Sequence, residues 1–332
     1  MKTYPIKFNP ILKEKIWGGT KIVSEFKKGN SDRPIGESWE ISGVDGNIST
    51  VVNGDYSGMT LNELQSTFTS EFLGEENYSR FGKDFPLLIK FLDAASDLSI
   101  QVHPDDEMAR ERHGGYGKTE MWYVMDHEED ASVIMGLKDQ QTDLPTKEID
   151  TPAIETVFKR EKVKNGDTFS IPAGMVHALG AGVMVAEIQQ TSDITYRIFD
   201  WNRKDTEGKQ RQLHIDLAQE AIKNCDDTKS VSYHASPNSV VKTVSNEFFT
   251  TNVVDVRSKY IRELSEVNSF VIYMCVEGRI SITVDNHTEI IRTGETVLLP
   301  ANSSQAIFYG PKARLLEVYV DPLMHTTMEA AA

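Results

Sequence analysis

The sequence has 332 residues, 39% of them hydrophobic, and a formal net charge of −15 at pH 7. This length fits two domains, and the apolar content is enough for a core in each. Nucleic-acid and anionic-membrane surfaces need clustered Lys and Arg, so an acidic chain without long runs of one charge argues against both partners. A local basic pocket for a phosphorylated small molecule remains compatible with this composition.

The cysteine content and the N-terminus indicate the compartment. Cys225 and Cys275 are too few for a disulfide framework, and each is expected to be a small buried hydrophobic residue in a reducing compartment. Residues 1–8 lack the apolar region of a leader, and no stretch is long enough to cross a bilayer. We therefore expect a cytoplasmic protein.

The N-terminal third predicts strands around one helix. Residues 8–17 alternate apolar and polar up to a Gly-Gly turn, and residues 35–42 predict a half-buried strand. Trp17 and Trp39 are interpreted as core residues rather than as sugar-stacking platforms. Residues 60–72 carry apolar residues at helical spacing, with Thr60 and Glu63 forming a capping-box signature. Residues 85–100 predict two strands joined by a turn.

The middle of the chain predicts short strands joined by polar loops. Residues 102–120 form a Gly-rich polar loop with an acidic run that is either a solvated loop or a helix start, and His113 is expected at the surface. Further strands are predicted over residues 131–137, within 163–172 and over 183–189. A short helix or lid is predicted over 146–158, and a helix over 213–224 that supports the barrel.

One segment occurs twice. Residues 166–178 align without gaps on residues 294–306, at an offset of 128, which indicates two copies of one β module. Gln305 stands where the first copy has His177, so we expect the second module to bind no metal. Its short alternating strands are those of a sandwich or jelly roll. The predicted division is a metal-binding catalytic domain over 1–235 and a degenerate β domain over 236–332.

Four polar residues form a candidate metal site. Gln101 and His103 are two apart, so on an extended segment they project from one face. Glu120 lies in an apolar, β-rich setting, and His177 follows a Gly/Pro turn. Two imidazoles, one carboxylate and one amide oxygen suit zinc or another borderline divalent ion, with one position left open. The alternatives are hydrogen-bonded core histidines, a hydrogen-bonding glutamine, and a surface ion pair between Glu120 and Lys118.

The ordered motifs resemble a known family. Residues 166–177 resemble the second metal-binding motif of the cupin superfamily, whose members are small jelly rolls. Residues 99–105, residues 118–121, His177, and Glu187 with residues 192–197 are similar, in this order, to the type I mannose-6-phosphate isomerases, in their short bacterial form. The resemblance covers most of the chain. It implies a mainly β fold of two cupin-like jelly rolls with a few short flanking helices, and one zinc ion (Zn2+) per chain bound by Gln101, His103, Glu120 and His177.

The sequence departs from the long members of this family in three places. Asp106 stands where they usually carry Lys, and Thr119 replaces a Pro before Glu120. The stretch 120–165 is too short for their large helical insertion. These differences leave the four expected ligands unchanged.

The activity that the resemblance implies is the interconversion of mannose 6-phosphate and fructose 6-phosphate. Moving a proton between C2 and C1 through an enediol needs a base, a polarised carbonyl and a grip on the phosphate. Arg197 suits phosphate or enediolate charge, although it can also pair with Asp193 if both lie on a helix. The site candidates that go with this activity are Arg197, Lys118, Asp193 and Glu187 for catalysis, and Ser99, Lys118 and Arg197 for substrate binding. The sequence leaves the identity of the base open.

Two other functions fit parts of the sequence. A dioxygenase-like metal cupin usually places two His close together in its first motif and binds iron, so Gln101 argues against it. A sugar-phosphate-binding protein without turnover would not need the acid/base candidates that this chain retains. The sequence does not set the oligomeric state.

Overall fold

The computed structural model describes residues 1–30, 32–138, 142–144, 152–204, 207–225 and 230–322. The chain divides into two compact units, one made of Leu12–Ser38 and Lys90–Val231, the other of Met1–Ile11, Trp39–Ile89 and Ser232–Ala332. The last segment therefore begins close to the boundary predicted at residues 235/236. It shares its unit with two N-terminal segments that the sequence division assigned to the catalytic domain. That division remains a prediction.

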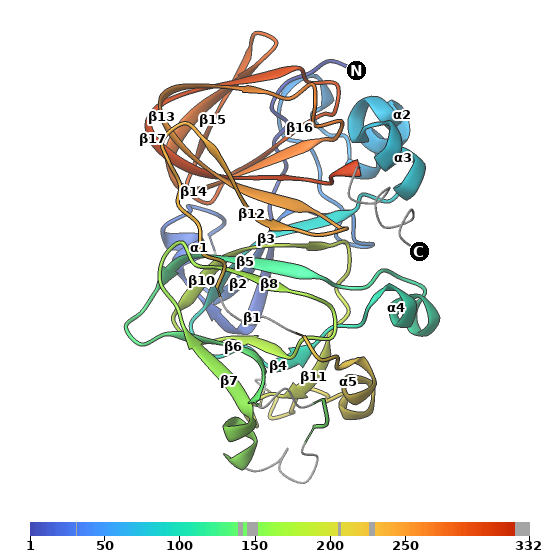
Figure 1. Cartoon of the computed structure of the whole chain (residues 1–332), viewed down its shortest axis with the longest axis vertical. Coiled ribbons are helices and arrows are strands. Elements are labelled where there is room, and N and C mark those ends of the chain that lie inside the picture. The colour runs from blue at the N-terminus through green and yellow to red at the C-terminus, as the bar shows by residue number, and fades with distance from the viewer. Residues whose placement is uncertain (31, 139–141, 145–151, 205–206, 226–229, 323–332) are drawn as a thin grey trace. The chain divides into compact units, whose positions relative to one another are not determined.

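Two antiparallel sheets, whose strands are labelled in Figure 1, carry the predicted site residues Gln101, Glu120, His177, Glu187 and Arg197. The first sheet has the strand order β1 (Ile11–Gly19), β2 (Ile35–Ile41), β3 (Leu87–Ala94), β10 (Val183–Gln190), β5 (Glu120–His127) and β8 (Thr168–Ile171). The second sheet has the order β11 (Tyr196–Phe199), β4 (Ile100–Val102), β9 (His177–Leu179), β6 (Ser132–Leu137) and β7 (Phe158–Lys162).

The second sheet separates two parts of the core. On β6, Val133 and Met135 pack in one cluster with Trp122 and Phe169, while Ile134 packs in another with residues of α5 (Ile215–Ala221). Successive side chains of a strand point to opposite faces, so this alternation places one face toward the first sheet and the other against helical cover. The predicted helix over 213–224 is thus confirmed in its central part.

The remaining helices are short. In the described part of the chain they are α1 (Lys21–Ser24), α2 (Leu61–Leu73), α3 (Glu75–Phe81), α4 (Asp106–His113), and the 3-10 helices η1 (Gly54–Tyr56) and η3 (Pro152–Val157). The capping box predicted before α2 is confirmed, because the Thr60 hydroxyl accepts from the Glu63 amide and the Glu63 carboxylate accepts from the Thr60 amide. Among the described residues, no helix is long and apolar enough to cross a membrane.

The C-terminal sheet has the order β12 (Val240–Ser245), β13 (Thr250–Glu263), β17 (Gln305–Tyr319), β14 (Val271–Val284) and β15 (His287–Arg292), with β16 (Thr296–Leu299) also paired to β14. The internal repeat is visible here, since β8 and β16 are offset by 128 residues at both ends and β9 and β17 begin at His177 and Gln305. The mainly β, cupin-like fold class is confirmed.

Several local expectations need correction. Residues 35–42 were expected to be half-buried, but all seven residues of β2 are buried, and Glu37 pairs with Lys15 at 2.9 Å. The alternating pattern predicts separate strands over 270–276 and 280–284, but a single strand, β14, runs from Val271 to Val284, with register shifts against β17 on both sides of Gly278. Gly278 has φ +88°, and a Cβ there would lie 2.4 Å from the Lys312 carbonyl oxygen.

The predicted loop before Glu120 contains a helix. Asp105 is the N-cap of α4 and accepts a hydrogen bond from the Met108 amide at 2.9 Å, while Gly114 ends the helix with φ +67°. The acidic run is therefore a helix start. Trp17 and Trp39 are core residues, with 3% and 5% of their surface exposed. Of the short helix or lid predicted over 146–158, residues 146–151 lie outside the described part of the chain, and the helix η3 follows.

Candidate metal centre

Three predicted site residues form one row across the second sheet. Gln101 on β4 is directly opposite His177 on β9 and opposite Arg197 on β11. Directly opposed residues of an antiparallel pair project to the same face, so all three side chains leave the sheet on one side. The neighbouring residues Ile100 and Val102 face the other side and pack in the core. The strand register thus brings together residues that are up to 96 positions apart.

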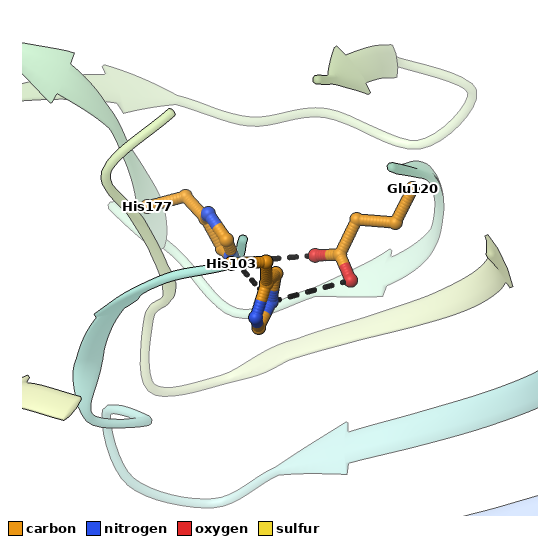
Figure 2. A group of neighbouring side chains, drawn as sticks. All are labelled: His103, Glu120 and His177. Atoms are coloured by element: carbon orange, nitrogen blue, oxygen red, sulfur yellow. Dashed lines mark hydrogen bonds and ion pairs between the residues drawn. The ribbon is translucent and has the colours of Figure 1, made fainter. Parts of the chain in front are cut away.

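Glu120 and two histidines converge at this face (Figure 2). His177 Nε2 lies 3.2 Å from Glu120 Oε1, His103 Nε2 lies 3.6 Å from Glu120 Oε2, and the two Nε2 atoms are 3.1 Å apart. All three residues are at most 1% exposed. The Gln101 amide nitrogen lies 3.5 Å from His177 Nε2. The four predicted ligands therefore lie together, and their role as ligands remains a prediction.

The hydrogen bonds of the two imidazoles define their tautomers. His103 Nδ1 lies 2.9 Å from the Ile194 carbonyl oxygen, and His177 Nδ1 lies 2.8 Å from the Met175 carbonyl oxygen. A carbonyl oxygen only accepts, so each Nδ1 carries a proton that it donates, and each Nε2 faces the cluster. This is the arrangement of metal-binding histidines, whose other ring nitrogen donates to a fixed acceptor.

Glu120 supplies the negative charge of the cluster. Both of its oxygens are buried and accept no hydrogen bond of good geometry, although the Lys118 ammonium lies 3.0 Å from Oε2. Burial by itself raises the pKa of Glu120, but the Lys118 cation, together with the interactions of Glu120 with His103 and His177, outweighs it and holds the pKa well below its usual value. A buried carboxylate beside two imidazole Nε2 atoms fits a divalent borderline cation.

His103 is neutral in this environment. Desolvation, helped by the Lys118 cation, lowers the pKa of His103 well below 6.5. Lys118 Nζ lies 3.1 Å from His103 Nε2, so the ammonium contacts both an imidazole and the carboxylate. Lys118 is 5% exposed. The alternative of a surface ion pair between Lys118 and Glu120 is therefore wrong, because both partners are buried.

Three consecutive backbone amides fix the approach to Glu120. The bonds run from Gly117 N to Asp106 Oδ1 at 2.7 Å, from Lys118 N to Pro104 O at 3.0 Å and from Thr119 N to Gln190 Oε1 at 2.8 Å. The Thr119 hydroxyl also accepts from the Ala173 amide at 3.2 Å. The two positions that depart from the long family members, Asp106 and Thr119, thus both hold the segment that carries Lys118.

Glu187 lies on the inner wall of the same barrel, with 3% of its surface exposed. Its Oε1 accepts from Lys90 Nζ at 2.9 Å, and its Oε2 accepts from Trp122 Nε1 at 2.8 Å. Burial lowers the pKa of Lys90, but nearby carboxylates, first among them Glu187, outweigh it and raise the pKa overall. Sequence reasoning missed Lys90 and Trp122. The available signal was Lys90 itself, a single cation inside the apolar run 85–92.

Arg197 lies in a cationic part of the site. Its Nη1 donates to the Gln212 carbonyl at 3.0 Å, and its Nε is buried without an acceptor. Burial, reinforced by the nearby Arg211 cation, lowers the pKa of Arg197. Asp200 accepts from Arg211 Nε at 2.7 Å and from Arg203 Nη2 at 2.6 Å. Arg197 belongs to strand β11, so the alternative of a helical pair with Asp193 is wrong.

The other predicted residues lie around the cluster. Asp193 is exposed on the loop between β10 and β11, next to Ile194, whose carbonyl holds His103. Ser99 is 3% exposed and directly precedes β4. His113 is exposed, as expected, and its Nε2 lies 2.8 Å from the Tyr196 hydroxyl.

The fold and the buried His/Glu/His cluster define a cupin-type protein. Residues 6–151 match the model of the type I phosphomannose isomerase catalytic domain, and residues 239–320 match that of the mannose-6-phosphate isomerase cupin domain. The chain is 36% identical over 303 residues to mannose-6-phosphate isomerase ManA of Bacillus subtilis, covering 90% of this chain and 94% of that protein. It belongs to the type I mannose-6-phosphate isomerase family of enzymes.

Two further relatives agree with this assignment. The mannose-6-phosphate isomerase of Streptococcus mutans is 33% identical over 298 residues, which cover 89% of this chain and 92% of that protein. The crystal structure of mannose 6-phosphate isomerase from Bacillus subtilis superposes with a TM-score of 0.83 at 33% identity, covering 95% of this chain and 99% of that one. The family resemblance and the enzyme class predicted from the sequence are thus confirmed.

Proposed function

We propose that this protein interconverts mannose 6-phosphate and fructose 6-phosphate with one zinc ion held by Gln101, His103, Glu120 and His177. The observation that carries the proposal is the convergence of two imidazole Nε2 atoms, each from a ring whose Nδ1 donates to a carbonyl, on the buried carboxylate of Glu120. Family membership supports the sugar-phosphate substrate, and the donor set supports a borderline divalent ion. The cytoplasmic location expected from the sequence remains a prediction.

The reaction moves a proton between C2 and C1 through an enediol and needs no oxidant. A bound divalent ion supplies a Lewis acid that polarises or orients a substrate oxygen. Lys118 donates to a substrate oxygen beside Glu120, because its ammonium is held next to the ligand set. Arg197, one strand away from Gln101, binds the phosphate or the enediolate charge. Of the three residues that the sequence suggests for the proton transfer, Lys118 and Asp193 remain the candidates, because both oxygens of Glu187 are already bonded, to Lys90 and Trp122.

Metal removal and reconstitution test the proposal. Protein stripped with a chelator should lose exchange between mannose 6-phosphate and fructose 6-phosphate, and one equivalent of zinc per chain should restore it. The variant His103→Ala should bind zinc weakly and be inactive. His113→Ala is the matched control, since this exposed imidazole lies ten residues further on and outside the cluster.

Two results would replace the proposal. Stoichiometric zinc without any exchange, together with retained binding of mannose 6-phosphate, would make the protein a sugar-phosphate sensor. Preferential iron loading with consumption of dioxygen would indicate a dioxygenase-like cupin.

A further inference from the structure

Trp122 connects the buried carboxylate of Glu187 to the ligand set. The indole ring meets the His177 imidazole edge-on, with ring centroids 5.5 Å apart and an interplanar angle of 77°. Trp122 is two residues after Glu120 on β5, so both side chains project from one face of that strand. The indole N–H is committed to Glu187 Oε2, which fixes the plane of the ring against which the imidazole packs.

Lys90 completes this chain of contacts. Glu187 has both oxygens engaged, one by the Lys90 ammonium and one by the indole. Lys90, Glu187 and Trp122 are 5%, 3% and 0% exposed. A buried carboxylate needs a compensating cation and fixed donors, and this one has both. Both oxygens of Glu187 therefore already have hydrogen-bond donors within the protein, without any group from a substrate.

The second module contains the same aromatic and carboxylate pair. On β5, Trp122 is opposite Glu187 on one side and Phe169 on the other, and on β14, Tyr273 is opposite Glu317 and Val297. Phe169 and Val297 are related by the 128-residue repeat, so Tyr273 occupies the position of Trp122.

The contacts of the second pair match those of the first. The Tyr273 hydroxyl donates to Glu317 Oε2 at 2.7 Å, and Asn252 on the next strand, β13, donates to Oε1 at 2.9 Å. Arg262 adds the cation, from Nε to Oε2 at 2.9 Å. This pair exists in a module whose counterpart of His177 is Gln305. The pair therefore belongs to the barrel wall and does not depend on ligand imidazoles.

We infer that Lys90, Glu187 and Trp122 are positioning residues that hold the His177 imidazole in its metal-binding orientation. Glu187 acts through Trp122, and it does not exchange a proton with the substrate. The inference rests on the proposed role of His177 as a metal ligand. Partners outside the ligand shell typically change metal affinity by about 10-fold to 100-fold when they are replaced, which sets the expected effect.

The test measures zinc affinity by competition with a chelator in Trp122→Phe and Glu187→Gln. Each variant should bind zinc about 10-fold to 100-fold more weakly than the wild type. The double variant should be no weaker than the weaker-binding single variant, because both break one chain of contacts. The pH profile of kcat should keep its shape in both single variants, and Lys90→Arg, which keeps the cation, should recover most of the affinity lost in Lys90→Met.

Tyr273→Phe is the matched control. It removes the corresponding donor to Glu317 and should lower the thermal midpoint without changing zinc affinity. Wild-type zinc affinity in Glu187→Gln, with turnover lost by more than about 100-fold and normal activity in Trp122→Phe, would make Glu187 a proton-transfer group and overturn the inference. If Glu187→Gln does not fold, unchanged zinc affinity in Trp122→Phe overturns it alone. A wild-type protein that binds no zinc would instead refute the proposed function.

Discussion

Asp106 accepts a hydrogen bond from the Gly117 amide at 2.7 Å, and the same oxygen accepts from the Gln190 side chain at 2.9 Å. Gly117 must be glycine here, because a Cβ would lie 2.5 Å from the Asp105 carbonyl carbon. Asp106 therefore holds the main chain directly before Lys118. Where the long members of the family usually carry a Lys, this chain has Asp106, whose carboxylate instead fixes the main chain at Gly117.

We expect Asp106→Ala to slow turnover with little change in zinc content. Loss of this acceptor frees the Gly117 amide and lets Lys118 move relative to Glu120, and small misplacements of a reacting group cost about 10-fold to 100-fold. Asp106→Asn keeps a carbonyl acceptor and should retain most of the activity. Steady-state kinetics and metal analysis of both variants test this, and full turnover in Asp106→Ala would contradict the anchoring role.

Lys118→Met should abolish most turnover and leave zinc bound. Its ammonium contacts Glu120 and His103, so its removal takes away a competing cation while the ligand atoms remain. We expect kcat to fall by about 100-fold to 10,000-fold, the range for a lost acid/base group. Lys118→Arg serves as the charge-retaining control. A loss of zinc with unchanged kcat per bound ion would show that Lys118 acts only on the cluster.

Arg197→Ala should weaken substrate binding selectively. A charge-assisted hydrogen bond contributes about 1.5 to 3 kcal/mol, which corresponds to a KM for mannose 6-phosphate raised by roughly 10-fold to 150-fold. Inhibition by inorganic phosphate should weaken in parallel. Arg197→Lys should recover only part of the loss, because an ammonium lacks the planar fork of the guanidinium. An unchanged phosphate inhibition constant would move the anion site away from Arg197.

Asp200 should make stability depend on pH. Burial raises the pKa of Asp200, but hydrogen bonds from Arg211 and Arg203 outweigh it and lower the pKa below the usual 3.8. A depressed carboxyl pKa stabilises the folded state above about pH 4, and this contribution is lost as the pH falls through the folded-state pKa. Asp200→Asn should therefore cost about 1 to 3 kcal/mol of unfolding free energy at pH 7. The difference from the wild type should shrink below pH 4 in denaturant titrations, whereas a constant difference would exclude the ion pair as its cause.

The sequence was sufficient to predict which four residues lie together in the cluster, but it was not sufficient to predict the residues that pack around them. Gln101 and His103 are two residues apart, so an extended segment places them on one face. The Gly/Pro turn before His177 recurs in the second module, so the local pattern and the repeat were sufficient to identify these three residues as candidates. The capping box at Thr60 was equally readable, because a capping box is set by residues three apart. Such features depend on neighbours along the chain.

The features that the sequence did not predict depend on strand register. Lys90 reaches Glu187 across 97 positions, and Trp122 reaches Glu187 across 65. The residue pattern within β3 or β5 does not predict which residue of β10 will lie opposite Lys90 or Trp122. The register shift at Gly278 is a similar case, since the sequence shows a break in alternation while the pairing shows a strand that continues. The burial of β2 on both faces likewise follows from its neighbours.

Arg197, Gln101 and His177 stand on consecutive strands of one sheet, and neighbouring strands lie about 4.8 Å apart. Under the proposed roles, the distance between the metal ligands Gln101 and His177 and the phosphate-binding residue Arg197 is set by the spacing of the strands. A side-chain substitution cannot change this spacing. A one-residue insertion in β4 would turn Gln101 to the other face of the sheet and disrupt this fixed spacing. Selection for a longer or shorter substrate would therefore have to act on the surrounding loops.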